Sequence, residues 1–217
     1  MSGAELAGER PPPVLVLLAA GASRRLDTCK ALVALRAFPP ATPLALLLEA
    51  GAVLGGRPPL CVTGADHAAI AAAAPGGVEL LWNPQWSAGR TGSVRLAARR
   101  MGGADLCLAP VDVPLVPRRV FALLAEAWRG AGHPPRGWLA PRLGAGPAAR
   151  YGHPVVIGRE LAAELAGFAP DRPLRKLRER ARPLLAVETD SPAILAGLDE
   201  PADLPRLRAL LAAGEPR

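Results

Sequence analysis

Residues 14–30 read Val-Leu-Val-Leu-Leu-Ala-Ala-Gly-Ala-Ser-Arg-Arg-Leu-Asp-Thr-Cys-Lys. The apolar run at the start predicts a buried strand, and the small residues that follow predict a turn at its end. Gly21 has no Cβ, so the backbone can come close to a ligand there. Main-chain N–H groups after this strand, together with Arg25 and Lys30, can surround an anion. The spacing differs from GxxxxGK[ST] and from GxGxxG, so the stretch predicts a phosphate-binding loop of another kind.

The lysine of this stretch stands out against the composition of the chain. Among 26 lysines and arginines, only Lys30 and Lys176 are lysines. A compact ammonium group fits between phosphate oxygens where a planar guanidinium does not, so the two are not interchangeable at a tight phosphate site. Lys30 is therefore a candidate phosphate ligand; the alternative is an incidental, solvated lysine.

Length and composition predict one α/β domain over residues 14–213, preceded by a disordered tail over residues 1–13. The chain has 217 residues, of which 50% are hydrophobic, enough for one sizeable core. The tail lacks the basic and apolar regions of a signal peptide. No stretch of about 20 apolar residues is free of charges or helix breakers. These features favour a cytoplasmic protein without a membrane segment.

Charge and cysteine content exclude several other classes. The formal charge is +7, but the arginines are scattered and do not alternate with aromatic residues, so we expect no nucleic-acid partner. Anionic small molecules account for the charge equally well. Cys29, Cys61 and Cys107 lie far apart, which predicts neither a zinc site nor a disulfide framework. Unpaired thiols are typical of a reducing compartment.

Short apolar runs alternate with helical patterns, which predicts βαβ units in a mostly parallel sheet. The predicted strands are Val14–Leu18, Leu60–Thr63, Val78–Trp82, Leu106–Val111, Trp138–Ala140, Val155–Ile157 and Leu184–Val187. The predicted helices are Pro43–Leu54, Asp66–Ala74, one that starts near Thr91, Pro117–Trp128, Leu161–Leu165, Pro173–Arg180 and Pro201–Ala212. The proline- and glycine-rich residues 130–150 predict loops near a site.

Polar residues follow three of the predicted strands, where open α/β sheets bind their ligands. The first strand leads to Gly21, the third to Asn83 and the fourth to Asp112. A carboxylate at the end of a buried strand is a hard oxygen ligand suited to Mg²⁺ that bridges phosphates. The alternative for Asp112 is a cap of the next helix or of a turn. Asn83, in turn, can close an Asx turn, and Ser93 can simply belong to a helix.

One histidine has a context that suggests a role. His153 lies in Tyr151-Gly152-His153-Pro154, ahead of an apolar strand. The proline imposes an extended backbone before it, so the imidazole can be aimed at a phosphate, a metal or a pterin ring. A structural histidine is the alternative. His67 and His133 lack such a context, and we expect both at the surface.

Five motifs, in this order, resemble those of the MobA-like nucleotidyltransferases, which attach a nucleotide to the molybdenum cofactor. Residues 18–30 resemble L-A-A-G-x-S-x-R-M-G-x-x-K, but Leu26 replaces the methionine and Asp27 the second glycine. Residues 83–93 match N-P-x-W-x-x-G-x-x-x-S, residues 112–114 match D-x-P, and residues 152–154 match G-H-P. Residues 197–204 resemble D-x-D-T-P-E-D-L, with Asp199 as the second acid and Gly197 in place of the first. From the residues alone, Asp199 can equally be a helix N-cap.

The resemblance implies a three-layer α/β/α fold like that of the nucleotide-diphospho-sugar transferases, which is Rossmann-like, and an Mg²⁺-dependent nucleotidyl transfer that releases pyrophosphate. It implies catalysis by Arg25, Lys30 and Asp112, and Mg²⁺ binding by Asp112 and Asp199. An acceptor would contact Gly152, His153 and Pro154. The implied nucleotide-binding residues are Leu18, Ala19, Ala20, Gly21, Ala22, Ser23, Arg25, Lys30, Asn83, Gly89 and Ser93.

The resemblance also implies particular substrates. L-A-A-G is typical of the cytidylyl-transferring branch, whereas guanylyl-transferring relatives tend to read L-A-G-G, so we expect CTP as donor, molybdopterin as acceptor and a molybdoenzyme as partner. The alternatives are guanylyl or sugar-phosphate transfer. A nucleotide-binding protein with impaired catalysis is a third alternative, because Asp27 and Gly197 depart from the pattern. Asp27 can pair with Arg24 or Arg25, or hold Mg²⁺; we expect the pairing.

Overall fold

A computed structural model describes residues 10–214 of the chain. Residues 1–9 of the predicted disordered tail therefore lie outside the described residues. Residues 10–13 lead into the first strand, and Pro13 is already buried.

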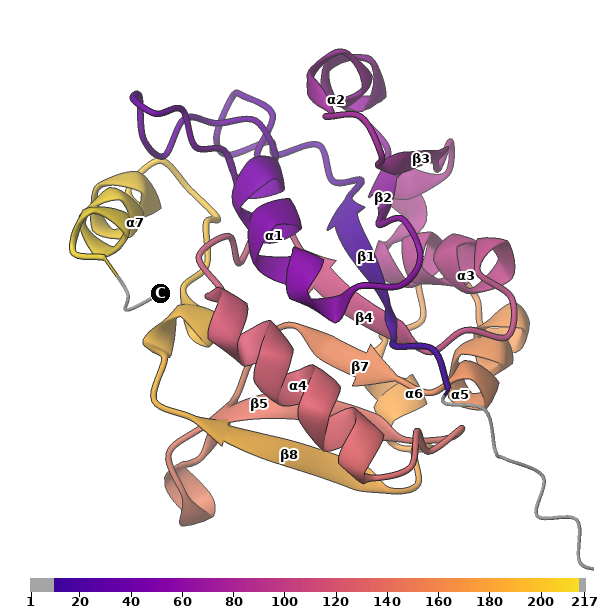
Figure 1. The fold of residues 1–217 in the computed structure, drawn as a ribbon. Coiled ribbons are helices and arrows are strands. Elements are labelled where there is room, and N and C mark those ends of the chain that lie inside the picture. Colours follow the sequence, from indigo (N-terminus) through magenta and orange to yellow (C-terminus); the bar gives the residue numbers. More distant parts are fainter. Residues whose placement is uncertain (1–9, 215–217) are drawn as a thin grey trace, which may run out of the picture.

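A mixed sheet forms the centre of the molecule (Figure 1). It is 8-stranded in the described residues, with the order β3-β2-β1-β4-β7-β5-β6, and β8 pairs with β5. The pairs within β3-β2-β1-β4 are parallel, as is β5 with β8, whereas β7 runs antiparallel to both β4 and β5. The strands are β1 (Val14–Ala19), β2 (Leu60–Thr63), β3 (Glu79–Trp82), β4 (Leu106–Pro110), β5 (Trp138–Leu143), β6 (Arg150–Tyr151), β7 (Val155–Ile157) and β8 (Leu184–Thr189).

Helices cover both faces of this sheet, so the predicted three-layer α/β/α architecture is confirmed (Figure 1). On one face, Leu47 and Phe121 belong to a core that also takes in Ile70. On the other face, Val94 and Leu161 belong to a second core. The first face carries α1 (Pro43–Gly51), α2 (His67–Ala73) and α4 (Arg118–Gly130); the second carries α3 (Arg90–Arg100), α5 (Arg159–Ala163) and α6 (Arg175–Arg178).

The strand β1 lies deep in the sheet because its residues are apolar without alternation. Val16 and Leu17 are fully buried, one toward each helical layer, as expected for a strand covered on both faces. Its parallel neighbours β2 and β4 run in register with it up to Thr63 and Pro110. The turns after these strands therefore meet at one edge of the sheet, and this edge carries the candidate site.

The last helix, α7 (Asp203–Ala212), lies apart from the sheet (Figure 1). Its Leu207 is fully buried in a small cluster with Leu26, Leu35 and Leu198. This cluster joins α7 to residues 26–35, at the end of the predicted phosphate-binding loop. It thereby brings residues 197–204 next to residues 26–35, although more than half of the chain separates them.

The second half of the sheet differs in detail from the prediction. Strand β5 is longer than the predicted Trp138–Ala140, because it continues to Leu143 and pairs there with β6, which the sequence did not predict. The predicted helix Pro173–Arg180 is helical only over Arg175–Arg178. Proline and glycine are frequent in residues 130–150, so no apolar pattern marks β6.

Asp105, just before β4, connects the two helical layers at the other edge of the sheet. Its carboxylate is 7% exposed and accepts hydrogen bonds from the Trp128 indole and from the Arg159 amide, both at 2.9 Å. His133 lies beside it, with Nδ1 3.6 Å from Asp105 Oδ2, and is only 7% exposed. The expectation of a surface His133 is therefore wrong: the turn after α4 places the imidazole beside Asp105, a contact distant in sequence that the local pattern does not encode. His67 is half-buried and bonds to Thr63 Oγ1 at 2.7 Å.

Across residues 10–214, no helix combines the length and the apolar character needed to cross a membrane.

Candidate active site

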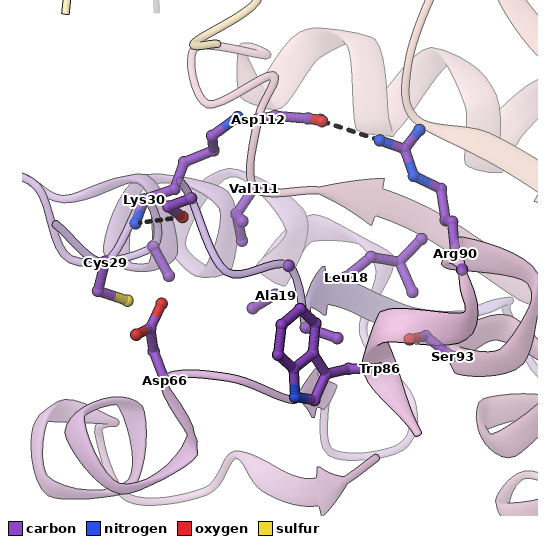
Figure 2. Close-up of a pocket in the computed structure, with 15 residues that line it drawn as sticks. Leu18, Ala19, Cys29, Lys30, Asp66, Trp86, Arg90, Ser93, Val111 and Asp112 are labelled. Carbon is purple, nitrogen blue, oxygen red and sulfur yellow. Dashed lines mark hydrogen bonds and ion pairs between the residues drawn. The ribbon is translucent and has the colours of Figure 1, made fainter. Parts of the chain in front are cut away.

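A cavity of about 170 Å³ lies at the carboxyl edge of β1 and β4 (Figure 2). The predicted phosphate-binding loop, residues 18–30, forms its floor, and the residues that follow β3 and β4 form its walls. Most of the predicted nucleotide and metal residues line this cavity. They are Leu18, Ala19, Ala20, Gly21, Ser23, Lys30, Gly89, Ser93 and Asp112.

Four of the predicted nucleotide and metal residues do not line the cavity, namely Ala22, Arg25, Asn83 and Asp199, and neither do the predicted acceptor residues Gly152, His153 and Pro154. Arg25 is exposed, and Ala22 is half-buried. Asn83 is 2% exposed and lies behind the wall, where its amide donates to Ser93 Oγ at 3.0 Å. Its Oδ1 also accepts from the Gln85 N–H at 3.0 Å, which is the predicted Asx turn. Asn83 therefore braces Ser93 from outside the cavity.

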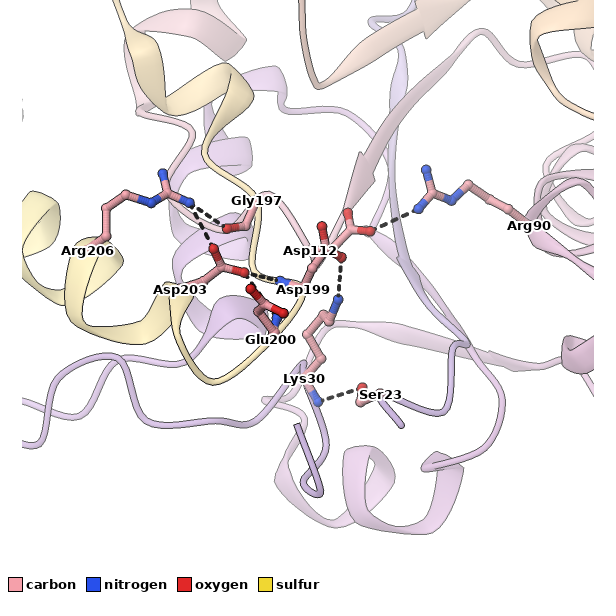
Figure 3. A network of polar contacts seen from close by, with 9 residues as sticks. All are labelled: Ser23, Lys30, Arg90, Asp112, Gly197, Asp199, Glu200, Asp203 and Arg206. Carbon is pink, nitrogen blue, oxygen red and sulfur yellow. Dashed lines mark hydrogen bonds and ion pairs between the residues drawn. The ribbon is translucent and has the colours of Figure 1, made fainter. Parts of the chain in front are cut away.

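Lys30 is held at both its backbone and its side chain. Its N–H donates to Ser23 Oγ at 3.0 Å, which closes the loop between the two residues. Its ammonium pairs with Asp199 Oδ1 at 3.2 Å and is 15% exposed. The ammonium is therefore largely enclosed at the cavity, and Figure 3 shows the contacts of Lys30 with Asp199 and Ser23.

The backbone places the two candidate metal carboxylates beside one another. The Leu198 N–H donates to the Asp112 carbonyl oxygen at 2.8 Å, so Asp199 follows a residue that is bonded directly to Asp112. Neither carboxylate is a helix cap. Pro117 precedes α4, and α7 starts only at Asp203, whose own carboxylate accepts from the Asp199 and Glu200 N–H groups. Capping therefore occupies neither acid; each forms an ion pair through one of its two carboxylate oxygens, Asp199 with Lys30 and Asp112 with Arg90.

This donor set fits a hard divalent cation. Two carboxylates supply charged oxygen ligands, and Mg²⁺ usually takes one or two carboxylates together with phosphate oxygens and waters. Within the described part of the chain, no group of three or more His, Cys, Asp or Glu residues is arranged so that it could hold a metal ion. A Cβ at Gly197 would lie 3.5 Å from Asp199 Oδ2, so an acid at that position would add a third carboxylate. Gly197 thus reduces the negative charge of the site.

The cavity also contains residues that the sequence did not predict. Arg90, the first residue of α3, donates to Asp112 Oδ2 at 2.9 Å. Cys29 and Asp66 line the opposite wall (Figure 2). Burial, followed by the charge of Asp66, raises the pKa of the Cys29 thiol, so the thiol stays protonated. The sequence feature that could have indicated Arg90 is its position directly after Gly89, a predicted nucleotide-binding residue, at the start of a predicted helix.

The imidazole of His153 lies near Arg90 and Asp112. Burial, and secondarily the charge of Arg90, lower its pKa to about 4, although the charge of Asp112 acts in the opposite direction. His153 is therefore neutral at physiological pH. Its Nδ1 is buried and has no hydrogen-bond partner among residues 10–214. Gly152 and Pro154, on either side, are buried.

Gly152 is expected to be essential for the position of His153. A Cβ at this residue would overlap the Ile194 carbonyl group, to which the His153 N–H donates at 3.0 Å. Gly152→Ala should therefore lower the free energy of unfolding by about 1–3 kcal/mol, because backbone atoms must move. Urea denaturation measures the effect. Gly167→Ala is the matched control, since a Cβ there meets nothing within 4 Å; equal stability of the two variants would contradict the prediction.

Asp27 does not behave as expected. In the described residues it forms no ion pair with Arg24 or Arg25, and its side chain is exposed. Its backbone has a φ of 51°, in the left-handed region that glycine adopts freely and that aspartate tolerates. The residue therefore preserves the turn for which a glycine stands in the resembling motif, and its charge points into solvent.

Comparisons with known proteins agree with this geometry. The model of the MobA-like NTP transferase domain matches residues 15–186. No curated protein sequence matches the chain. The crystal structure of Rv0371c from Mycobacterium tuberculosis H37Rv is similar, with 25% identity and a TM-score of 0.72 over 91% of this chain and 97% of that one.

A more distant structure has the same fold. Molybdopterin-guanine dinucleotide biosynthesis protein A from Archaeoglobus fulgidus is 18% identical, with a TM-score of 0.69 over 92% of this chain and 99% of that one. The family match covers most of the chain, including β1, its loop and Asp112. This protein therefore belongs to the family of MobA-like NTP transferases and is a nucleotidyltransferase by family.

Proposed function

We propose that this protein transfers CMP from CTP to the phosphate of molybdopterin and releases pyrophosphate. The observation that carries the proposal is the convergence of the 18–23 loop, Lys30 and Asp112 on one cavity, with Asp199 beside it and paired with Lys30. A triphosphate donor with a divalent cation needs this combination of amides, a cation and acids. The L-A-A-G opening supports CTP, and the pterin-related name of the Archaeoglobus fulgidus neighbour supports the acceptor.

The triphosphate would lie along the loop from Leu18 to Ser23. There the N–H groups after β1 are available, and Gly21 has open space where a Cβ would be. Lys30, fixed through Ser23, would neutralise the phosphate oxygens from one side. Ser93, held by Asn83, would contact the nucleoside from the wall formed by α3.

The reaction requires little covalent work from the protein. An oxygen of the acceptor phosphate attacks the α-phosphorus of CTP and forms the new P–O bond. The bond from the α-phosphorus to the oxygen shared with the β-phosphorus breaks, and pyrophosphate leaves with that electron pair. The protein contributes by aligning the two phosphates and by placing positive charge where negative charge develops.

Asp112 and Asp199 would hold the divalent cation that this transfer requires. When bound, such a cation neutralises charge on the α-phosphate and the acceptor and stabilises the transition state. Mg²⁺ is the proposed ion; a structure of the Rv0371c protein with manganese, 24% identical to this chain, supports divalent metal binding in this fold.

The acceptor would bind beside His153. A neutral imidazole can donate through one nitrogen and accept through the other, which suits both a phosphate and the polar edge of a pterin. Its buried, unpartnered Nδ1 is consistent with a ligand that supplies the missing partner. A molybdoenzyme that receives the product, in the cytoplasm, would complete the proposed setting.

A screen of the four nucleoside triphosphates tests this function. Purified protein, molybdopterin cofactor and Mg²⁺ are mixed with each triphosphate, and pyrophosphate release is measured. CTP should be the preferred donor, with release that depends on both cofactor and metal. Preference for GTP, or turnover with a sugar phosphate instead, would replace the proposed substrates. Tight nucleotide binding without release would indicate a binding protein.

A further inference from the structure

Arg90 occupies the cavity but has no role in the function proposed above. It follows Gly89, whose φ of 132° suits glycine, and its side chain extends from the start of α3 toward the loop after β4. One guanidinium nitrogen donates to Asp112 Oδ2 at 2.9 Å, and the side chain is 51% exposed. Its other guanidinium N–H groups have no partner among residues 10–214. Arg90 is therefore anchored at one point and has free donors that face the cavity.

The two cations of the site approach the acids from different sides (Figure 3). Lys30 comes from the phosphate-binding loop and pairs with Asp199, whereas Arg90 comes from α3 and pairs with Asp112. Each cation thus has its own carboxylate. A site that joins two phosphates needs two such positive groups, one for each phosphate, because the phosphates otherwise repel one another.

Arg90 lies on the side where the acceptor is expected. Its guanidinium is paired with Asp112 Oδ2 at 2.9 Å in the wall of the cavity, and the charges of both residues act on His153 of the G-H-P segment. Arg90 therefore supplies positive charge to this part of the cavity. A planar guanidinium with several N–H donors binds a phosphate through two parallel hydrogen bonds, which an ammonium cannot do.

We propose that Arg90 binds the phosphate of the acceptor and holds its attacking oxygen next to Asp112. This role rests on the proposed function and deepens it, because it selects acceptors with a terminal phosphate over acceptors with only hydroxyl or carboxylate groups. Arg90 then contacts a substrate, while Lys30 serves the triphosphate.

Phosphate binding measured by calorimetry tests this role without turnover. Inorganic phosphate is titrated into the full chain with Mg²⁺ and a saturating, non-hydrolysable CTP analogue. For Arg90→Met we expect the Kd for phosphate to rise at least about tenfold, as for loss of a charge-assisted contact. The Kd of Arg90→Lys should lie between that of the parent and that of Arg90→Met. The Kd for the CTP analogue should change by less than about twofold.

Arg99→Met is the matched control, since Arg99 is exposed in the last turn of the same helix; it should leave both affinities unchanged. An unchanged phosphate Kd in Arg90→Met, or no phosphate binding to the parent protein, would overturn the role. A larger loss of CTP-analogue affinity than of phosphate affinity would instead assign Arg90 to the triphosphate. If the analogue does not bind to the parent at all, the proposed function fails, and phosphate titration without it still decides whether Arg90 binds a phosphate.

Discussion

Asp112→Asn is expected to lower the rate of nucleotidyl transfer by about 10²–10³-fold, the range found when one group that stabilises transition-state charge is removed. The change keeps the side-chain volume but removes the charge that a metal ligand supplies. It also leaves Arg90 without its ion-pair partner at 2.9 Å. The fold should persist, because Asp112 caps no helix and its structural hydrogen bond to Leu198 comes from the backbone.

The measurement is kcat for pyrophosphate release, with the thermal midpoint measured alongside. Asp190→Asn is the control: like Asp112, Asp190 lies just after a strand and is ion-paired, but its side chain is 82% exposed and lies outside the cavity. Mn²⁺ affinity provides a second readout that is independent of turnover, and it should fall in Asp112→Asn alone. Wild-type turnover and wild-type Mn²⁺ affinity in Asp112→Asn would contradict the proposed mechanism.

Lys30→Arg should also reduce transfer strongly, by about 10²-fold, although the charge is retained. The ammonium lies 15% exposed between the Ser23 loop and Asp199, and a planar guanidinium does not fit the same space and angles. We expect a raised KM for CTP together with a lowered kcat. Both kinetic constants are measured over a CTP titration.

The chain contains its own control for this substitution. Lys176, the other lysine, is 44% exposed and pairs with Glu179 at 2.9 Å on α6. Lys176→Arg should be silent in both kcat and KM. If Lys30→Arg were equally silent, Lys30 would be an incidental lysine, and the triphosphate would need another ligand.

The sequence predicted the first half of the fold well for a physical reason. Strands β1, β2 and β4 are continuous apolar runs that end in glycine, proline or a charged residue, so their position and the edge at which they meet follow from local pattern. The candidate residues on these turns, such as Gly21 and Asp112, could therefore be expected at one cavity.

Where the prediction failed, the deciding contacts are distant in sequence. His133 is buried because it meets Asp105, and Asp105 is buried because it bonds to groups from α4 and α5. Arg90 could be placed on a helix but not next to Asp112, which lies 22 residues further along the chain. The solvent-facing position of Asp27 likewise depends on the path of the loop, which the order of residues does not specify.

The hydrogen-bonded pairing between β4 and β7 is short, and it ends before the segment where the acceptor is proposed to bind. It covers only Leu106 to Leu108, opposite Ile157 to Val155. The residue before β7 is Pro154, which has no N–H to donate. The Gly152 and His153 N–H groups donate to the carbonyl oxygens of Pro141 and Ile194. A ligand seated between Asp112 and His153 therefore interrupts no hydrogen bond of the sheet. Loops on this side can lengthen or change to suit a bulkier acceptor while the strands stay paired, so substrate range can evolve here without loss of the fold.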